Sequence, residues 1–438
     1  MILGPAGELH TGDAPQEAAR GINRRADELE QTIENWGMGL LKFMLNYGPE
    51  SLPCELSEQQ VVWKHAGPPA VADLAQTIDA TLATPRDYPC LTQAVIPEDH
   101  VAIVVDPDTP AWTELVNATG RQLCQAGVAR EAIQVILNQP LPPEAVASAA
   151  AKIEFPLCDH ETILSGKRTY LASTAEGDRI YLPAALVDAD CVVTISRFGF
   201  DEQWGYRGTH STIYPALASE ADRQRLQGKS HQELKPENSR GQRQTIDEIG
   251  WLLGLQYTVQ VIPATSGEVG HLLCGACDSV FQRGVELLNE SWRATVSQRA
   301  ETVVIALAGG AAQTPWSALS RACKSAAKLV LPEGRVILLA NPPALPETLL
   351  EILKNPAEPD ELLRKLNRIR TPETDALHAL VQLTKNAKVY FRSPWEDDTV
   401  ENLYCIPLNN EPEIRRALEG GETYAILEGA QYAYLDVE

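Results

Sequence analysis

The sequence has little positive charge and no long apolar segment, and each shortage argues against a class of protein. Its 438 residues include 37 Lys and Arg against 59 Asp and Glu, which gives a formal net charge of -22. No basic block offsets this charge locally, so binding to nucleic-acid backbones or anionic lipid surfaces is disfavoured. The chain has no run of about 18 apolar residues, and its N-terminus lacks a basic region followed by an apolar core. We therefore expect a cytoplasmic protein without nucleic-acid or membrane partners.

Cysteine is present, but its spacing does not complete a zinc site or a disulfide framework. The nine cysteines are an odd number, scattered through a chain large enough to fold without disulfides. Cys274 and Cys277 have CxxC spacing, yet neither a second pair nor a nearby His-x-x-x-His accompanies them. We favour ordinary buried thiols in a reducing compartment over metal binding or redox chemistry.

The length and the apolar content predict more than one hydrophobic core. A chain of 438 residues that is 44% hydrophobic is too long for one compact core. Residues 15–45 have apolar side chains at helical spacing, and Pro15 suits a first helical turn. We expect this helix to form an N-terminal extension over residues 1–43, ahead of two domains.

From residue 45 onward the pattern alternates between strands and helices. Residues 101–106 are an apolar run that ends in Asp106, followed by a helix from Pro110 to about residue 123 and a second apolar run at 132–137. This order predicts a βαβ unit with a parallel pair of strands. A further strand at residues 190–195 leads into a glycine-bearing loop.

A second unit of the same kind begins near residue 302. A strand at 302–307 leads to Gly309-Gly310, a helix over 315–328 and a strand at 335–339. Shorter strands are expected at 388–392 and 404–408, and the segments 423–427 and 432–437 could pair with either domain. The fold class that follows is α/β, with two Rossmann-like domains over residues 44–285 and 286–438 and a cleft between them.

The loop over residues 205–219 is the most informative stretch. It combines glycines with hydroxyl residues before Pro215, and it follows a buried strand. Free backbone N–H groups and a helix dipole at such a position favour an anion. The candidate ligand-binding residues are Arg207, Gly208, Thr209, His210 and Ser211. The spacing matches neither a P-loop nor a GxGxxG fingerprint, and a loop that merely caps its helix is the alternative.

This arrangement resembles the nickel-pincer lactate racemase family. In that family an Asp-x-Ala-Asp strand leads to a Phe-x-Gly-Gly-x-Lys-Ser loop and a Pro-Gly helix start. Here the strand, Gly208, a hydroxyl residue and Pro215 match. Weaker matches are Asp106 at its strand end, the segments 168–172 and 181–183, and Gly309-Gly310 with its following helix. The resemblance covers most of the chain from about residue 44 and implies hydroxyacid racemase or epimerase chemistry.

The departures from the family pattern concern the residues that carry this chemistry. The family's covalent lysine falls at Ser211, so a covalent cofactor bond cannot form there. The two acid–base histidines fall at Leu141 and at approximately Asp201 or Glu202, and the substrate-binding arginine falls at Thr109. Arg321 lies near a family active-site lysine and keeps its charge.

Each remaining candidate has a simpler structural alternative. His231 could be the nickel ligand that the resemblance implies, or an exposed loop histidine. Asp201 and Glu202 could move protons if buried, or they could be solvated acids. Arg321 could bind a carboxylate in the cleft or remain a solvated charge. Asp106 could bind a ligand at the sheet edge or cap the next helix.

Two functions follow as hypotheses. The first is a lactate racemase-like isomerase acting on a small 2-hydroxyacid or sugar acid, with nickel and a nickel-pincer nucleotide held non-covalently. Asp106, Thr109 and the loop of Arg207 would hold that cofactor. The second is a catalytically inactive member of the family that binds a nucleotide or carboxylate ligand. Loss of both histidines, the lysine and the arginine favours the second.

Overall fold

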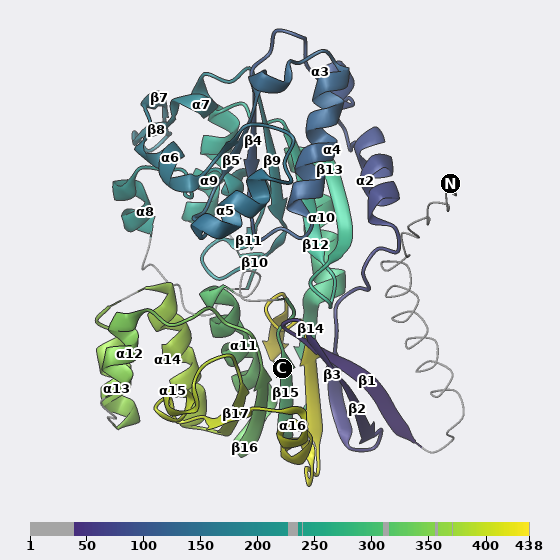
Figure 1. Cartoon of the computed structure of the whole chain (residues 1–438), viewed down its shortest axis with the longest axis vertical. Coiled ribbons are helices and arrows are strands. Elements are labelled where there is room, and N and C mark those ends of the chain that lie inside the picture. Colours follow the sequence, from purple (N-terminus) through teal and green to yellow (C-terminus); the bar gives the residue numbers. More distant parts are fainter. Residues whose placement is uncertain are drawn as a thin grey trace, which may run out of the picture.

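The computed structural model describes residues 39–226, 235–238, 240–309, 315–354, 358–369 and 371–437. Two six-stranded sheets organise this part of the chain, each with helices on both faces. We call the first sheet with its helices the first lobe and the second sheet with its helices the second lobe (Figure 1). The mixed α/β fold is therefore confirmed.

The first sheet is built mainly from parallel strands in the order β13-β12-β9-β4-β5-β6, and β13 alone runs antiparallel to its neighbour. Successive strands β4, β5 and β6 extend to one side, whereas β9 and β12 extend to the other. The order thus reverses between β4 and β9. The strands are β4 (Val101–Val105), β5 (Ile133–Leu137), β6 (Leu157–Cys158), β9 (Cys191–Arg197), β12 (Tyr257–Pro263) and β13 (Val269–Ala276).

Alternate side chains of each central strand pack on opposite faces of this sheet. Ile103 and Val105 of β4 join one core cluster, and Ala102 and Val104 join another. The first face is covered by α2 (Leu74–Ala83), α3 (Leu91–Ala94), α4 (Trp112–Gln125) and α5 (Pro143–Ala150). The second is covered by α6 (His160–Ser165), α7 (Ala184–Val187) and α9 (Gly241–Leu252). Burial on both faces explains why the sequence of these strands is a continuous apolar run.

The second sheet is parallel throughout, in the order β18-β17-β16-β15-β19-β3. Its strands are β3 (Val61–His65), β15 (Ala300–Ala306), β16 (Val330–Leu339), β17 (Lys388–Arg392), β18 (Ile406–Pro407) and β19 (Tyr424–Glu428). Its helices are α11 (Trp316–Leu329), α12 (Glu347–Leu353), α13 (Pro359–Leu366), α14 (Pro372–Thr384), α15 (Asp397–Glu401) and α16 (Glu411–Leu418). The last strand, β20 (Tyr434–Val437), pairs in parallel with β14 (Arg293–Val296), which follows α10 (Cys277–Trp292).

The expected helix over residues 15–45 is wrong at its C-terminal end. Leu40–Tyr47 form strand β1, which pairs with β2 (Glu50–Ser57) around Gly48 at φ 52°. Leu45 and Tyr47 alternate toward the second sheet, so a two-residue period replaces the helical one. The rest of the expected helix, up to residue 38, lies outside the described residues.

The sheets divide the chain differently from the expected domains. The strands β1–β3 precede the first lobe in sequence but lie with the second lobe, because β3 pairs with β19 (Figure 1). The boundaries expected at residues 43/44 and 285/286 stay predictions. In the part of the chain that the structure describes, no helix is long and apolar enough to cross a lipid bilayer.

The lobes meet through the hairpin of β10 (Gly199–Asp201) and β11 (Gly205–Arg207), which follows β9 directly. Phe198, Phe200 and Tyr206 belong to the same core cluster as the main second-lobe helices. The hairpin therefore continues from the first lobe and packs against the second lobe. Elements of the first lobe not yet given are the hairpin β7 (Arg168–Ser173) and β8 (Arg179–Pro183), helix α8 (Glu220–Leu226), and the 3-10 turns η1 (Arg130–Ala132) and η2 (Thr209–Thr212).

Candidate functional site

A cavity of about 290 Å³ lies at the carboxyl edge of the first sheet. Its lining includes Asp106, which follows β4, and Arg197, which ends β9. These two strands are neighbours, and the strand order reverses between them. In open α/β sheets the ligand-binding crevice forms at this reversal, outside the carboxyl ends of the strands. The cavity therefore occupies the position where this architecture binds ligands.

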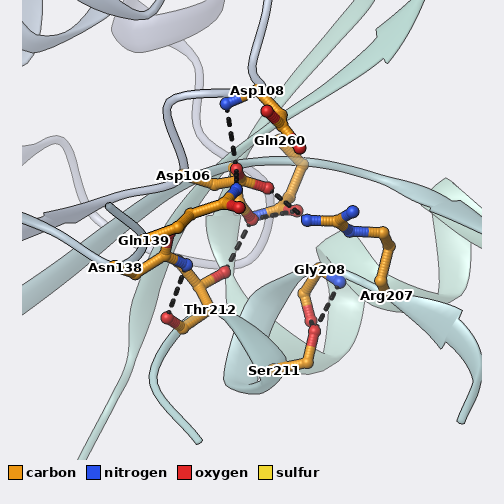
Figure 2. Close-up of polar contacts among 10 residues, drawn as sticks. Asp106, Asp108, Asn138, Gln139, Arg207, Gly208, Ser211, Thr212 and Gln260 are labelled. Carbon is orange, nitrogen blue, oxygen red and sulfur yellow. Dashed lines mark hydrogen bonds and ion pairs between the residues drawn. The ribbon is translucent and has the colours of Figure 1, made fainter. Parts of the chain in front are cut away.

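Asp106 is the centre of a buried polar network (Figure 2). Its residue exposure is 1%, and Arg207 donates to its Oδ2 across 2.6 Å. The Asp108 backbone N–H and the Gln139 side-chain amide both donate to Oδ1, at 3.0 and 2.5 Å. A buried carboxylate with an ionic partner and two further donors is fully compensated. Asp106 and Arg207 thus neutralise each other within the fold.

Arg197 lies in the same cavity without such compensation. It is 8% exposed, and its guanidinium makes no hydrogen bond or ion pair with any residue that the structure describes. Its charge instead lies over the ring of Tyr432, at 5.5 Å from the ring centre. Burial and the neighbouring charge of Arg207 lower the pKa of Arg197 to about 10, although Asp108 opposes the shift. The group stays charged at neutral pH, and it lines the cavity without an anionic partner among the described residues.

The floor of the cavity is a chain of buried hydrogen bonds between β9, β12 and η2. The Thr212 hydroxyl donates to Ser196 at 2.7 Å, and the Ser196 hydroxyl donates to the Gln260 side chain at 2.9 Å. The Asn138 amide Nδ2 donates to the carbonyl of Thr212 at 2.9 Å (Figure 2). This bond fixes the orientation of the Asn138 amide. Its Oδ1 is then a buried acceptor to which no described residue donates.

The loop that the sequence identified is a tight 3-10 turn rather than the start of a long helix. Gly208 adopts φ 117°, and a Cβ there would lie 2.6 Å from Gln260 Oε1. Ser211 Oγ accepts from the Gly208 N–H at 2.7 Å and donates to the Gly208 carbonyl at 3.1 Å (Figure 2). Because Ser211 itself takes the Gly208 N–H, the expectation that this group is free for an anion is wrong. The serine lines the cavity while its hydroxyl closes the turn.

His210 and the two threonines lie away from the cavity lining. The His210 Nδ1 is 3.0 Å from Asp247 Oδ1 on α9, and its ring packs against Gly250. Thr209 Oγ1 accepts from Arg243 at 3.3 Å. The Thr109 N–H closes the turn after β4 by donating to the Asp106 carbonyl at 3.0 Å. Their ligand-binding roles stay predictions that this geometry does not support.

The carboxylates expected to act as acid or base separate between two cavities. Asp201 lines the first cavity and also a second one of about 830 Å³, and its Oδ1 accepts the backbone N–H groups of Gln203 and Trp204. Glu202 lines only the second cavity, where Lys324 binds it at 2.6 Å. Arg321 of α11 lines the second cavity as well. Of these three side chains, only Asp201 therefore lines both cavities.

The sequence analysis did not identify several polar residues of the cavity, among them Arg197, Asn138 and His160. His160 follows β6, and burial lowers the pKa of its imidazole, so it is neutral at pH 7. Its Nε2 lies 3.4 Å from the Ala216 carbonyl. The signal that could have found Arg197 was the one that found Asp106, namely a charged residue at the end of an apolar strand. Leu141, at the position of a family histidine, packs against the first-lobe core.

The described residues do not fit a covalently held metal cofactor. Ser211 stands where a linking lysine would be needed, and no group of three or more His, Cys, Asp or Glu side chains that could hold a metal occurs among the described residues. His231 lies outside them. The nine cysteines are all free thiols. Burial raises the pKa of five of them to about 11 or 12, at Cys54, Cys191, Cys274, Cys277 and Cys323, and raises the pKa of Cys405 well above its usual value.

The fold and the cavity define a doubly wound α/β protein with a cationic ligand crevice at the strand reversal of its first sheet. Residues 47–227 match the model of the lactate racemase N-terminal domain family. This match covers less than half of the chain and identifies that segment as a lactate racemase-like N-terminal domain.

Solved structures agree with this assignment at the level of the fold. The lactate racemase apoprotein from Thermoanaerobacterium thermosaccharolyticum superimposes with a TM-score of 0.65 at 12% identity, covering 90% of this chain and 100% of that one. A Thermotoga maritima protein solved by a structural genomics consortium gives a TM-score of 0.56 at 13% identity, covering 85% and 100%. No curated protein matches the chain.

Proposed function

We propose that this protein binds a small 2-hydroxyacid or sugar acid in the cavity at the carboxyl edge of the first sheet. The observation that carries the proposal is Arg197, a buried guanidinium without an anionic partner among the described residues. An uncompensated buried charge costs several kcal/mol, which a bound carboxylate would offset. Arginine suits this role because its planar fork matches a carboxylate.

Asn138 is the residue that favours a hydroxyacid over a simple carboxylic acid as the ligand. Asn138 lines the cavity, and its Oδ1 is a buried acceptor without a described donor. A ligand hydroxyl would supply the missing donor, since a buried polar group left unpaired costs about 1–3 kcal/mol. A molecule with a carboxylate for Arg197 and a hydroxyl for Asn138 fits both groups.

Calorimetry with D- and L-lactate, glycerate, gluconate and propionate tests this proposal. Arg197→Gln should weaken binding of every acid about 10–100-fold, as expected for charge-assisted hydrogen bonds of about 1.5–3 kcal/mol. Asn138→Ala should weaken the hydroxyacids but leave propionate unchanged. The control Arg121→Gln alters an exposed ion pair on α4 and should bind like wild type. Equal affinity of wild type and Arg197→Gln for all of these acids would refute the proposal.

Isomerase activity is a second candidate, and Asp201 is the observation that favours it. Its Oδ1 is occupied by two backbone donors, while no described residue hydrogen-bonds its Oδ2. One base facing the cavity could exchange a proton on one side of a substrate, whereas two-base inversion needs a partner that Leu141 cannot supply. Incubation of a bound hydroxyacid in D₂O should then give deuterium at C2 by NMR, and Asp201→Asn should abolish it.

The nickel-pincer nucleotide, held non-covalently, belongs to this second candidate alone. We derive no step through it, because the described residues offer neither the lysine nor a cluster of metal ligands. Metal and nucleotide analysis of protein purified from its native host decides this point. Stoichiometric nickel with a nucleotide supports the isomerase, and a colourless apoprotein supports the binding protein.

A further inference from the structure

The second cavity lies between the lobes and is larger than the first. Its volume is about 830 Å³, and its walls come from the β10–β11 hairpin, α11 and β20. Small-molecule sites typically occupy about 300–1,000 Å³ and often form between structural units. The cavity is thus large enough for a ligand of its own. Asp201 is the side chain that it shares with the first cavity.

Positive charge is concentrated around this cavity in an otherwise acidic protein. Three acidic side chains line it, Asp201, Glu202 and Asp436, against five basic ones, Lys235, Arg299, Arg321, Lys324 and Lys328. Asp436 is already bound to Arg293 at 2.6 Å, and Asp201 accepts the N–H groups of its own turn. Because the formal net charge of the chain is -22, a local excess of cations is the exception on this molecule.

Arg321 is the least compensated of these cations. Its Nη1 is buried, and no described residue accepts a hydrogen bond from it. The neighbouring acids act on it only at longer range, since no ion pair within 4 Å joins it to a described carboxylate. A guanidinium nitrogen hidden from water without an acceptor is costly unless a ligand supplies one.

Two further cations, Lys324 and Lys328, lie on the same face of α11 as Arg321. Arg321, Lys324 and Lys328 are three and four residues apart, so they lie on one side of the helix. At 1.5 Å per residue, the seven residues from Arg321 to Lys328 span about 10 Å along the axis. Lys324 pairs with Glu202, but both side chains are about half exposed, at 52% and 53%. Such pairs are worth about 0–1 kcal/mol, so a ligand anion can replace the carboxylate.

We propose that this cavity is a second binding site, for a small polyanion that carries two or more phosphate or carboxylate groups along about 10 Å. Arg321 is its inner anchor, and Lys324 and Lys328 hold the outer groups. Arg299, which is exposed at the rim and makes no ion pair with a described residue, adds a further charge. This site is separate from the hydroxyacid site of Arg197 and does not depend on it.

Calorimetry of the full chain at low ionic strength, with tripolyphosphate, citrate and orthophosphate as probes, tests the proposal. We expect one equivalent of tripolyphosphate to bind to wild type and one equivalent of citrate to bind to Arg197→Gln, in which the hydroxyacid site is disabled. Both should bind at least tenfold more tightly than orthophosphate and more weakly as salt is added. Preference for tripolyphosphate indicates an organic phosphate ligand, and preference for citrate indicates a polycarboxylate. The double variant Arg321→Gln/Lys328→Gln should lose at least tenfold in affinity.

Two single variants keep the test informative if the double variant folds poorly. Arg299→Gln changes an exposed side chain and should weaken binding about threefold, whereas Arg416→Gln, on the exposed face of α16, should have no effect. Arg197→Gln should leave the affinity for tripolyphosphate unchanged, because Arg197 does not line this cavity. The proposal is overturned if neither polyanion binds to wild type, or if Arg299→Gln and the double variant bind as tightly as wild type. A loss of affinity in Arg416→Gln equal to that in Arg299→Gln would overturn the proposal as well.

Discussion

Replacing Arg197 with methionine should stabilise the ligand-free protein while it destroys acid binding. Burial, together with the neighbouring charge of Arg207, lowers the pKa of the Arg197 guanidinium from its usual value to about 10. At about 1.4 kcal/mol per pKa unit, this corresponds to about 3 kcal/mol of lost solvation at neutral pH. The contact with Tyr432, worth about 1 kcal/mol, acts in the opposite direction. The expected net gain from Arg197→Met is about 2 kcal/mol.

The assay is urea and thermal unfolding at pH 7, in a buffer free of small carboxylates and phosphate. The folded-state pKa lies below the unfolded value, so the penalty is fully present below about pH 10 and disappears as pH rises from there through the ordinary pKa of arginine. A gain of about 2 kcal/mol should raise the melting temperature of a unit of 150–250 residues by about 4–8 °C. Arg197→Lys keeps the charge and should gain nothing. If ligand-free Arg197→Met melts below wild type, Arg197 stabilises the fold and the reasoning is refuted.

Three further predictions concern the surrounding network. Arg207→Met leaves the buried Asp106 carboxylate unpaired and should lower the free energy of unfolding in urea by about 3–5 kcal/mol. Adding Asp106→Asn should recover most of this loss of stability. An unchanged urea midpoint in the single variant would contradict the ion pair. Gly208→Ala should lower the free energy of unfolding by about 2–5 kcal/mol, because the backbone φ of 117° and the 2.6 Å approach of Gln260 both exclude a Cβ. A variant as stable as wild type would show that the turn relaxes. Melting temperatures should fall as pH drops below 6.5. Burial holds the pKa of several histidines below that unfolded value, so their stabilising neutral form is lost as pH falls through the folded-state pKa. His160→Gln should flatten this slope, and a melting temperature constant from pH 7.5 to 5 would contradict the prediction. The histidines concerned are His65, His160, His271 and His378.

The strands around the cavity were predictable because they are buried on both faces. Residues 101–105 and the β9 region appear in the sequence as continuous apolar runs, and both are strands in the structure. Asp106 was predictable as a site residue because it follows such a run. Its pairing with Arg207 was not, since 101 residues separate the two and only the fold brings them together.

Local patterns also failed where tertiary packing decides the outcome. The β1 segment, which the sequence suggested as helix, is a strand because its alternate residues pack on the second sheet. His210 suited an anion site by position, yet its ring is held by Asp247 from α9. Arg197 ends its strand much as Asp106 follows β4, but its lack of an anionic partner, which makes it a candidate binding residue, is visible only in three dimensions.

The decisive measurement is a crystal structure of the wild-type protein with the hydroxyacid that binds most tightly. We expect the carboxylate at the carboxyl edge of β4 and β9, within hydrogen-bond distance of Arg197, and the hydroxyl donating to Asn138 Oδ1. A structure in which the acid binds elsewhere, or in which Arg197 forms an ion pair with a protein carboxylate and the cavity holds only water, would contradict it.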